Sequence, residues 1–258
     1  MSGLTYSMNK NKIESLADNV INPITGELFS IPSLDMGGYA DLRFILREGG
    51  SMGDLYSRTD LRRDANGAIY MDESNNVYTQ KIDNPDSYIK LGSVLPKGNL
   101  AWRNNFMWKN FHVGFMISAR LGGVVFSRTQ AVLDKFGVSE ASADARDNGF
   151  VLINGNDRIN PENWYTTVGS TAVPQYYTYS ATNVRLQEAS IGYTIPRKWL
   201  ANICDIKVSL IGRNLWMIYN KAPFDPEAVA STDNFYQGID NFMMPSLRNV
   251  GFSLNFKF

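Results

Sequence analysis

Hydrophobic and polar residues alternate along the last thirteen positions of the chain, residues 246–258. The apolar positions are Val250, Phe252, Leu254, Phe256 and Phe258, and the residues between them are polar or small. Successive side chains of a β-strand point to opposite faces, so this period of two predicts a strand with one apolar and one polar face. Such a strand fits between lipid and a wet lumen, although a strand of a soluble sandwich also alternates.

The same alternation predicts four more strands in the second half of the chain, at residues 100–108, 111–121, 184–195 and 206–219. The first two are joined by a very short turn at 109–110, which indicates an antiparallel hairpin. In the last of the four the alternation blurs after Gly212, and a bulge is one explanation. Residues 4–11 read as a further strand near the N-terminus.

The connections between these strands alternate in length. They are short at 109–110 and 196–204 and long at 127–181 and 220–245, with short helices expected at 129–136 and 139–146. Bacterial outer-membrane barrels have short periplasmic turns on one rim and long extracellular loops on the other. We therefore predict an all-β fold, an antiparallel transmembrane β-barrel. Six strands are fewer than a small barrel needs to close in lipid, so we expect this chain to be part of a larger barrel.

The composition narrows the possible functions. Lys plus Arg and Asp plus Glu both number 25 in 258 residues, so the net charge of zero argues against a nucleic-acid partner. His112 and Cys204 are the only residues of their kinds, which leaves little material for a metal site or for Ser-His or Cys-His catalysis. We expect no metal, no cofactor and no enzyme activity. No run of about 18 apolar residues predicts a membrane helix. No signal peptide opens the chain, so we expect either a soluble protein or the C-terminal part of a longer one.

Motifs spread over nearly the whole chain resemble the C-terminal portion of SusC/RagA-type TonB-dependent transporters of the Bacteroidetes outer membrane. Each motif is weak alone, and their order and spacing carry the resemblance. The matching segments are residues 6–13, 48–56, 64–69, 108–111, 119–123, 184–196, 212–215, 225–227 and 251–258.

The resemblance implies a 22-stranded barrel with a plugged lumen, in the cell outer membrane. It implies TonB-dependent import of a bulky nutrient, an oligosaccharide or a peptide, together with a SusD-like lipoprotein. We expect residues 1–97 to hold one strand and a large extracellular excursion, and residues 98–258 to hold five barrel strands and their loops. The resemblance places the plug and the segment that contacts TonB N-terminal to the matching portion, so we expect this chain to lack both and the remaining barrel strands to lie elsewhere in a full-length protein.

Three groups of residues are candidates for specific roles. The resemblance implies an assembly signal for outer-membrane insertion at Asn249, Gly251, Leu254, Phe256 and Phe258. Aromatic residues at the ends of barrel strands are candidates for interfacial girdles, with ordinary core packing as the alternative: Trp102, Trp108, Tyr193 and Trp199. Aromatic residues in the long loops are candidates for contact with substrate or lipoprotein, with packing between loops as the alternative: Trp164, Tyr176, Tyr177, Tyr179, Phe235 and Tyr236.

Two other functions remain open from the sequence. A soluble, secreted, β-rich carbohydrate-binding module would use the loop aromatics as its platform, but it needs a second sheet over the apolar strand faces. A glycan-degrading enzyme needs an acid/base pair of carboxylates, and Glu188 and Asp205 do not form a convincing one.

Overall fold

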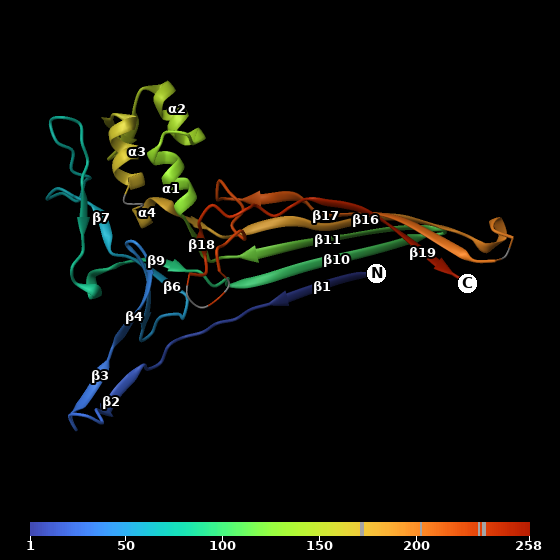
Figure 1. The fold of residues 1–258 in the computed structure, drawn as a ribbon, viewed down its shortest axis with the longest axis horizontal. Coiled ribbons are helices and arrows are strands. Elements are labelled where there is room, and N and C mark those ends of the chain that lie inside the picture. The colour runs from blue at the N-terminus through green and yellow to red at the C-terminus, as the bar shows by residue number, and fades with distance from the viewer. Residues whose placement is uncertain (171–172, 202, 232, 234–235) are drawn as a thin grey trace.

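A long antiparallel sheet of six strands forms one arm of the molecule, which is described here from a computed structural model covering residues 1–170, 173–201, 203–231, 233 and 236–258 (Figure 1). The strands, in their spatial order, are β1 (Ser2–Ser7), β10 (Gly98–Trp108), β11 (Phe111–Leu121), β16 (Asn183–Ile195), β17 (Asp205–Asn220) and β19 (Asn249–Lys257). The sheet is open in this structure, with β1 and β19 at its two edges. Among the described residues, no helix is long and apolar enough to cross a bilayer.

These strands lie where the alternating pattern predicts them, because the pattern follows directly from strand geometry. Only β1 differs clearly from its expected extent: it ends at Ser7, whereas the sequence predicted a strand to Asn11. Ser7 pairs with Asn99, one residue from the start of β10, so β10 offers little further length for the strand to pair with.

The bulge expected after Gly212 is present. In the pairing of β16 with β17, Glu188 lies opposite Arg213 while Leu186 lies opposite Trp216, so two residues of β17 face the single residue Gln187. One of these two residues, Asn214, has a φ of 51°, which asparagine tolerates better than most residues. Beyond the bulge, Trp216 pairs with the apolar Leu186.

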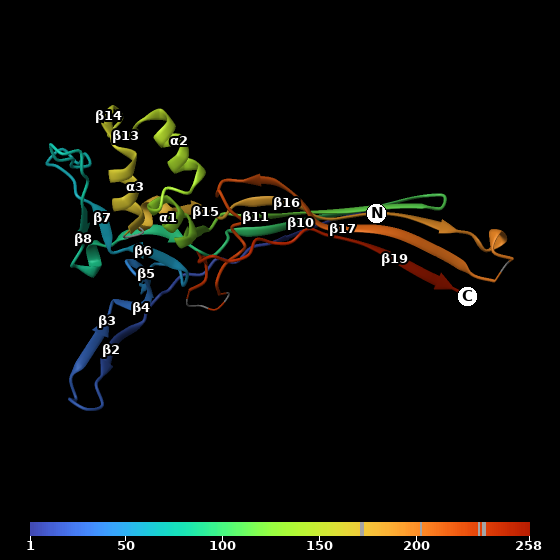
Figure 2. The ribbon, with the colours of Figure 1, turned by 45° about the horizontal axis from the view of Figure 1, so that its top comes forward.

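Short strands fill the long connection between β1 and β10. They are β2 (Ala17–Ile21), β3 (Leu28–Ile31), β4 (Ser33–Tyr39), β5 (Leu42–Arg47), β6 (Asp54–Ser57), β7 (Thr59–Leu61), β8 (Thr79–Lys81) and β9 (Ile89–Ser93), with a 3-10 helix, η1 (Pro85–Ser87). Strands β4, β5, β6 and β9 form a four-stranded sheet, whereas β2 and β3 form a hairpin that projects away from the rest (Figures 1 and 2).

Helices dominate the second long connection. Its elements are β12 (Val124–Ser127), α1 (Arg128–Lys135), α2 (Glu140–Asn148), β13 (Val151–Ile153), β14 (Asp157–Ile159), α3 (Pro161–Ser170), α4 (Pro174–Tyr177) and β15 (Thr178–Ser180). Later in the chain follow η2 (Arg197–Trp199), a 3-10 helix, and β18 (Ile239–Asp240), which pairs with β12. The side chains of Ser127 and Ser139 cap α1 and α2 by accepting backbone hydrogen bonds, which stabilises the start of each helix.

The buried hydrophobic core lies in these connections and not in the arm. Its members include Leu42, Phe44, Phe126 and Val168, and none of them comes from the six long strands. Helices α1 and α3 approach closely at Gly169, where a Cβ atom would lie 2.6 Å from the carbonyl oxygen of Ala131. We call this part of the structure, the described residues among 12–97, 122–182 and 221–248, the loop body.

Candidate functional site

One face of the arm is apolar across all six strands. Rows of opposing residues run across the sheet, and one such row is Leu4, Trp102, Ile117, Leu186 and Trp216. Another row joins Ile191 to Leu210 and Leu210 to Phe252, and these side chains are 53%, 54% and 77% exposed. Polar residues on this parity include Ser2 of β1 and its partner Asn104 of β10, which is buried. The face therefore presents large apolar side chains that no other described part of the chain covers.

The four aromatic residues expected in interfacial girdles all have exposed or half-buried side chains. Trp108, Tyr193 and Trp199 lie at the end of the arm that carries the short turns, where the Phe111 ring packs between Trp108 and Tyr193. Trp102 lies six residues from Trp108, about 20 Å along the strand. It shares its row with Trp216, an exposed tryptophan that the sequence analysis did not single out.

The residues expected to form the assembly signal lie on or next to the edge strand β19. Asn249 and Gly251 occupy its polar parity, while Leu254, Phe256 and Phe258 belong to the exposed apolar parity. Strand β19 pairs with β17 on one side, and within the described residues no strand pairs with its other edge.

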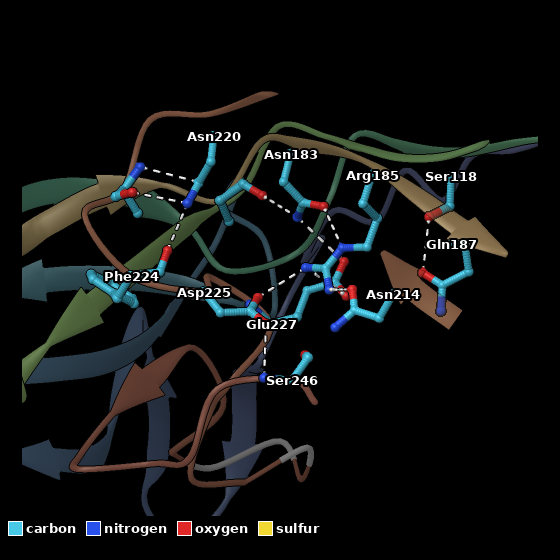
Figure 3. A network of polar contacts seen from close by, with 12 residues as sticks. Ser118, Asn183, Arg185, Gln187, Asn214, Asn220, Phe224, Asp225, Glu227 and Ser246 are labelled. Carbon is cyan, nitrogen blue, oxygen red and sulfur yellow. Dashed lines mark hydrogen bonds and ion pairs between the residues drawn. The ribbon is translucent and has the colours of Figure 1, made fainter. Parts of the chain in front are cut away.

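A network of polar contacts lies where the opposite, polar face of the arm meets the loop body (Figure 3). Its centre is Arg185 of β16, which is 3% exposed. The guanidinium donates to Asp225 Oδ1 at 2.9 Å, to Asn214 Oδ1 at 3.3 Å and to Asn183 Oδ1 at 3.2 Å. It also forms an ion pair with Glu227 at 3.2 Å. A single arginine thus ties the sheet to the loop that follows β17.

Asp225 fastens a second point of the same loop. Its carboxylate accepts hydrogen bonds from the backbone N–H groups of Glu227 and Ser246, at 3.1 and 3.2 Å. Burial raises the pKa of this carboxyl, but the hydrogen bonds from Ser246, Glu227 and Arg185 outweigh burial and lower the pKa below its usual value. Asp225 is therefore charged at neutral pH and holds both ends of the loop.

Four of the six loop aromatics come together in one cleft of about 740 Å³ in the loop body, between helices α1, α2 and α3 and the start of the loop after β17. These four are Trp164, Tyr176, Tyr177 and Tyr179, and Tyr165 joins them. Trp164 and Tyr177 are buried at 8% and 2% exposure, in agreement with the packing alternative for these two. Tyr176 and Tyr179 are half-buried.

Ring contacts fix the orientation of the cleft aromatics. Trp164 and Tyr176 meet edge to face, with ring centroids 5.3 Å apart, and Tyr179 meets Phe224 in the same way at 5.5 Å. The backbone carbonyl of Phe224 accepts a 2.6 Å hydrogen bond from Asn220, and Phe224 directly precedes Asp225. The Arg185 network therefore positions one wall of the aromatic cleft.

The tyrosine hydroxyls of the cleft keep their protons. Burial raises the pKa of Tyr179 to about 12, with a further contribution from the charge of Asp134. Burial also raises the pKa of Tyr177, again helped by Asp134, and that of Tyr176, although nearby Arg63 acts in the opposite direction there. Each of these hydroxyls is a hydrogen-bond donor at any physiological pH.

Tyr236 does not line this cleft and is half exposed in the loop before β18. Phe235 lies outside the residues that the structure describes, so its expected contact stays a prediction. Over the described residues, no group of three or more His, Cys, Asp or Glu side chains is placed to hold a metal ion.

Some residues of the site were not predicted from the sequence. Arg185 lies within a segment that resembles the family, but only its burial beside Asp225 and Glu227 identifies its role. The acidic residues that line the cleft, Asp134, Glu140 and Asp144, lie on predicted helices whose packing partners were not predicted.

The chain is similar to known proteins in sequence and in fold. No family model matches the chain. The chain is 25% identical, over 286 aligned positions, to the TonB-dependent receptor P3 of Formosa agariphila (strain DSM 15362); the match covers 100% of this chain and 26% of the receptor. Its fold matches a chain of the RagAB peptide importer in two states. The TM-score is 0.65 in the closed-closed state and 0.67 in the open-open state, with 16% and 14% identity.

The structural matches likewise cover 100% of this chain and 27% or 26% of the importer chain. The chain therefore spans about a quarter of the length of the relatives it matches. Those relatives are a receptor and an importer, not enzymes, as was expected for this chain. The chain is thus a mostly β-stranded relative of the TonB-dependent receptors, similar in fold to part of the RagAB peptide importer.

Proposed function

We propose that this chain forms part of the wall of a TonB-dependent receptor in the cell outer membrane, which imports a bulky nutrient, an oligosaccharide or a peptide. The observation that carries the proposal is the continuous exposed apolar face of the arm, opposite a polar face, on strands of 9 to 16 residues. Strands of about 9–11 residues cross a bilayer when tilted. Exposing this apolar face to water would cost much free energy. Lipid on the apolar side and a wet lumen on the polar side suit both faces.

The open edges of the sheet support the same assignment. An open edge cannot lie in lipid because its N–H and C=O groups would have no partner. In this proposal the edges at β1 and β19 pair with further strands of a 22-stranded barrel, and a plug and a TonB-contacting segment complete the protein. Residues 1–97 then supply one strand and an extracellular excursion, and residues 98–258 supply five strands and their loops.

The roles of individual residues follow from this arrangement. Trp102, Trp108, Tyr193 and Trp199 would lie at the lipid interfaces, where aromatic rings are favoured. Asn249, Gly251, Leu254, Phe256 and Phe258 would form the signal for membrane insertion. The loop body would face the cell exterior and meet a SusD-like lipoprotein, and the RagAB importer, whose fold is similar, handles peptides.

The soluble carbohydrate-binding module is less well supported. It requires a second sheet packed over the apolar face of the arm, and the described strands of the loop body lie beyond one end of the arm instead (Figures 1 and 2).

Fractionation of the cells that produce this protein tests the proposal. An antibody to residues 249–258 should detect a protein that sediments with the outer membrane and resists extraction with alkaline carbonate. Recovery of the protein from the soluble fraction, as a monodisperse species without detergent, would refute the proposal.

A further inference from the structure

The aromatic cleft of the loop body carries more negative than positive charge. Asp134, Glu140 and Asp144 line it, and Lys221 is the one cationic side chain among its lining residues. Within the part of the chain that the structure describes, the carboxylates of Glu140 and Asp144 have no ion-pair or hydrogen-bond partner, although ion pairs neutralise carboxylates elsewhere in the loop body. The cleft therefore offers exposed carboxylates that have no ion-pair partner, together with aromatic rings.

The size and shape of the cleft suit a segment of a longer molecule. Its volume of about 740 Å³ falls in the usual range for ligand sites, about 300–1,000 Å³. Trp164 forms a buried part of the wall, while Glu140, Asp144 and Lys221 are exposed at its margin. The cleft thus combines an aromatic wall with charged side chains that solvent and a ligand can both reach.

The rings and the carboxylates both favour a cation. The face of a tyrosine or tryptophan ring attracts an ammonium or guanidinium group, and a carboxylate binds the same groups through charge-assisted hydrogen bonds. The hydroxyls of Tyr176 and Tyr179 make no hydrogen bond within the described residues, so they remain available to the carbonyl groups of a peptide. A neutral sugar would use the rings and hydroxyls but would leave the unpaired charges of Glu140 and Asp144 without a counterion.

We infer that this cleft binds a peptide segment through a lysine or arginine side chain, with Glu140 and Asp144 as the residues that select for positive charge. The inference deepens the proposed function, and it rests on that function for the role of the cleft as an outer contact site for a nutrient. The binding itself depends only on the loop body.

The test uses the protein solubilised in detergent from its native membrane, and calorimetric titration with short peptides. A pentapeptide with a central lysine should bind at least about tenfold more tightly than the same peptide with norleucine, which has no charge. Raising the salt concentration should weaken binding of the lysine peptide and leave the norleucine peptide unchanged.

Variants identify the residues responsible. The double substitution Glu140→Gln with Asp144→Asn should abolish the preference for lysine while leaving the affinity for the norleucine peptide unchanged. Asp147→Asn is the matched control: Asp147 lies on the same helix, does not line the cleft, and its substitution should change nothing. Equal affinity for the two peptides would overturn the inference.

A neutral hexasaccharide provides the competing outcome. If it binds more tightly than the lysine peptide, and if Tyr179→Ala abolishes that binding, the cleft is a glycan site and the inference is wrong. Either result leaves the membrane assignment intact, because that assignment is tested separately by fractionation.

Discussion

A charge placed on the apolar face of the arm tests whether that face meets lipid. Leu210 lies on this face between Ile191 and Phe252, and Ser209, its neighbour in β17, points to the polar face. Leu210 lies five residues after Asp205, the first residue of β17, about 17 Å along the strand. With a tilt of about 45° this is about 12 Å from the strand end, near the middle of an apolar band about 25 Å tall.

The two possible environments predict very different costs for Leu210→Lys. In lipid, a lysine near the bilayer midplane costs about 2–4 kcal/mol, which lowers the folded-to-unfolded ratio by about 30- to 800-fold. In water, replacement of an exposed side chain changes stability by less than about 0.5 kcal/mol. Ser209→Lys adds the same charge to the same strand on the wet face, where Lys207 already lies, so its cost should be small in both environments.

The free energy of unfolding of both variants is measured in guanidinium chloride, with the full-length protein reconstituted into liposomes. The shift in gel mobility on heating reports the folded fraction of the barrel. A reduction of at least about 2 kcal/mol for Leu210→Lys alone supports the lipid-facing assignment. Equal stabilities for the two variants would show that the apolar face does not contact lipid, and the argument for a membrane wall would fail.

Three further results are expected. Arg185→Met leaves the buried carboxylate of Asp225 without its cation, so it should destabilise the loop at 221–248 by about 3–5 kcal/mol and speed its proteolysis. The control Arg213→Met breaks an exposed ion pair and should cost at most about 1 kcal/mol. Equal cleavage rates for the two variants would contradict this. Because the pKa of Asp225 is lowered, its stabilising contribution is complete above about pH 4 and is lost as the pH falls through the lowered value. Proteolysis of the loop should therefore accelerate in acid in the unaltered protein but not in Asp225→Asn, which has no carboxyl to protonate. Gly169→Ala forces helices α1 and α3 apart and should lower the stability of the loop body by about 1–3 kcal/mol in thermal unfolding. Gly3→Ala, where a Cβ has open space, is the control, and an unchanged melting temperature for Gly169→Ala would refute the close approach of the helices.

The strands of the arm could be predicted because each depends on a local pattern. In Phe111–Leu121 or Asn249–Lys257, the period of two alone tells which face of the sheet each side chain occupies. The bulge at Asn214 was also visible as a break in that pattern. A strand boundary such as Ser7 was not, because it is set by the partner strand.

The loop body could not be predicted to the same extent, because its structure depends on contacts between distant segments. Helix α3 begins at Pro161, a favoured residue at the first turn of a helix. The sequence nevertheless did not lead us to expect a helix there, because residues 154–161 have the composition of a turn. The pairing of Arg185 with Asp225 joins residues 40 positions apart, and a single sequence carries no record of such a contact.

The hydrophobic core contains no residue of the six long strands, and this separation affects how the protein can change over evolutionary time. A substitution in the core alters the binding surface without disturbing the register of the arm, and a substitution on the apolar face leaves the cleft as it was. Arg185 is one point where the two parts depend on each other, and Arg120, which donates to the backbone carbonyl of Val94 at 2.7 Å, is another. New ligand preferences can therefore arise in the loop body while the arm stays the same, provided that such variants keep these contacts.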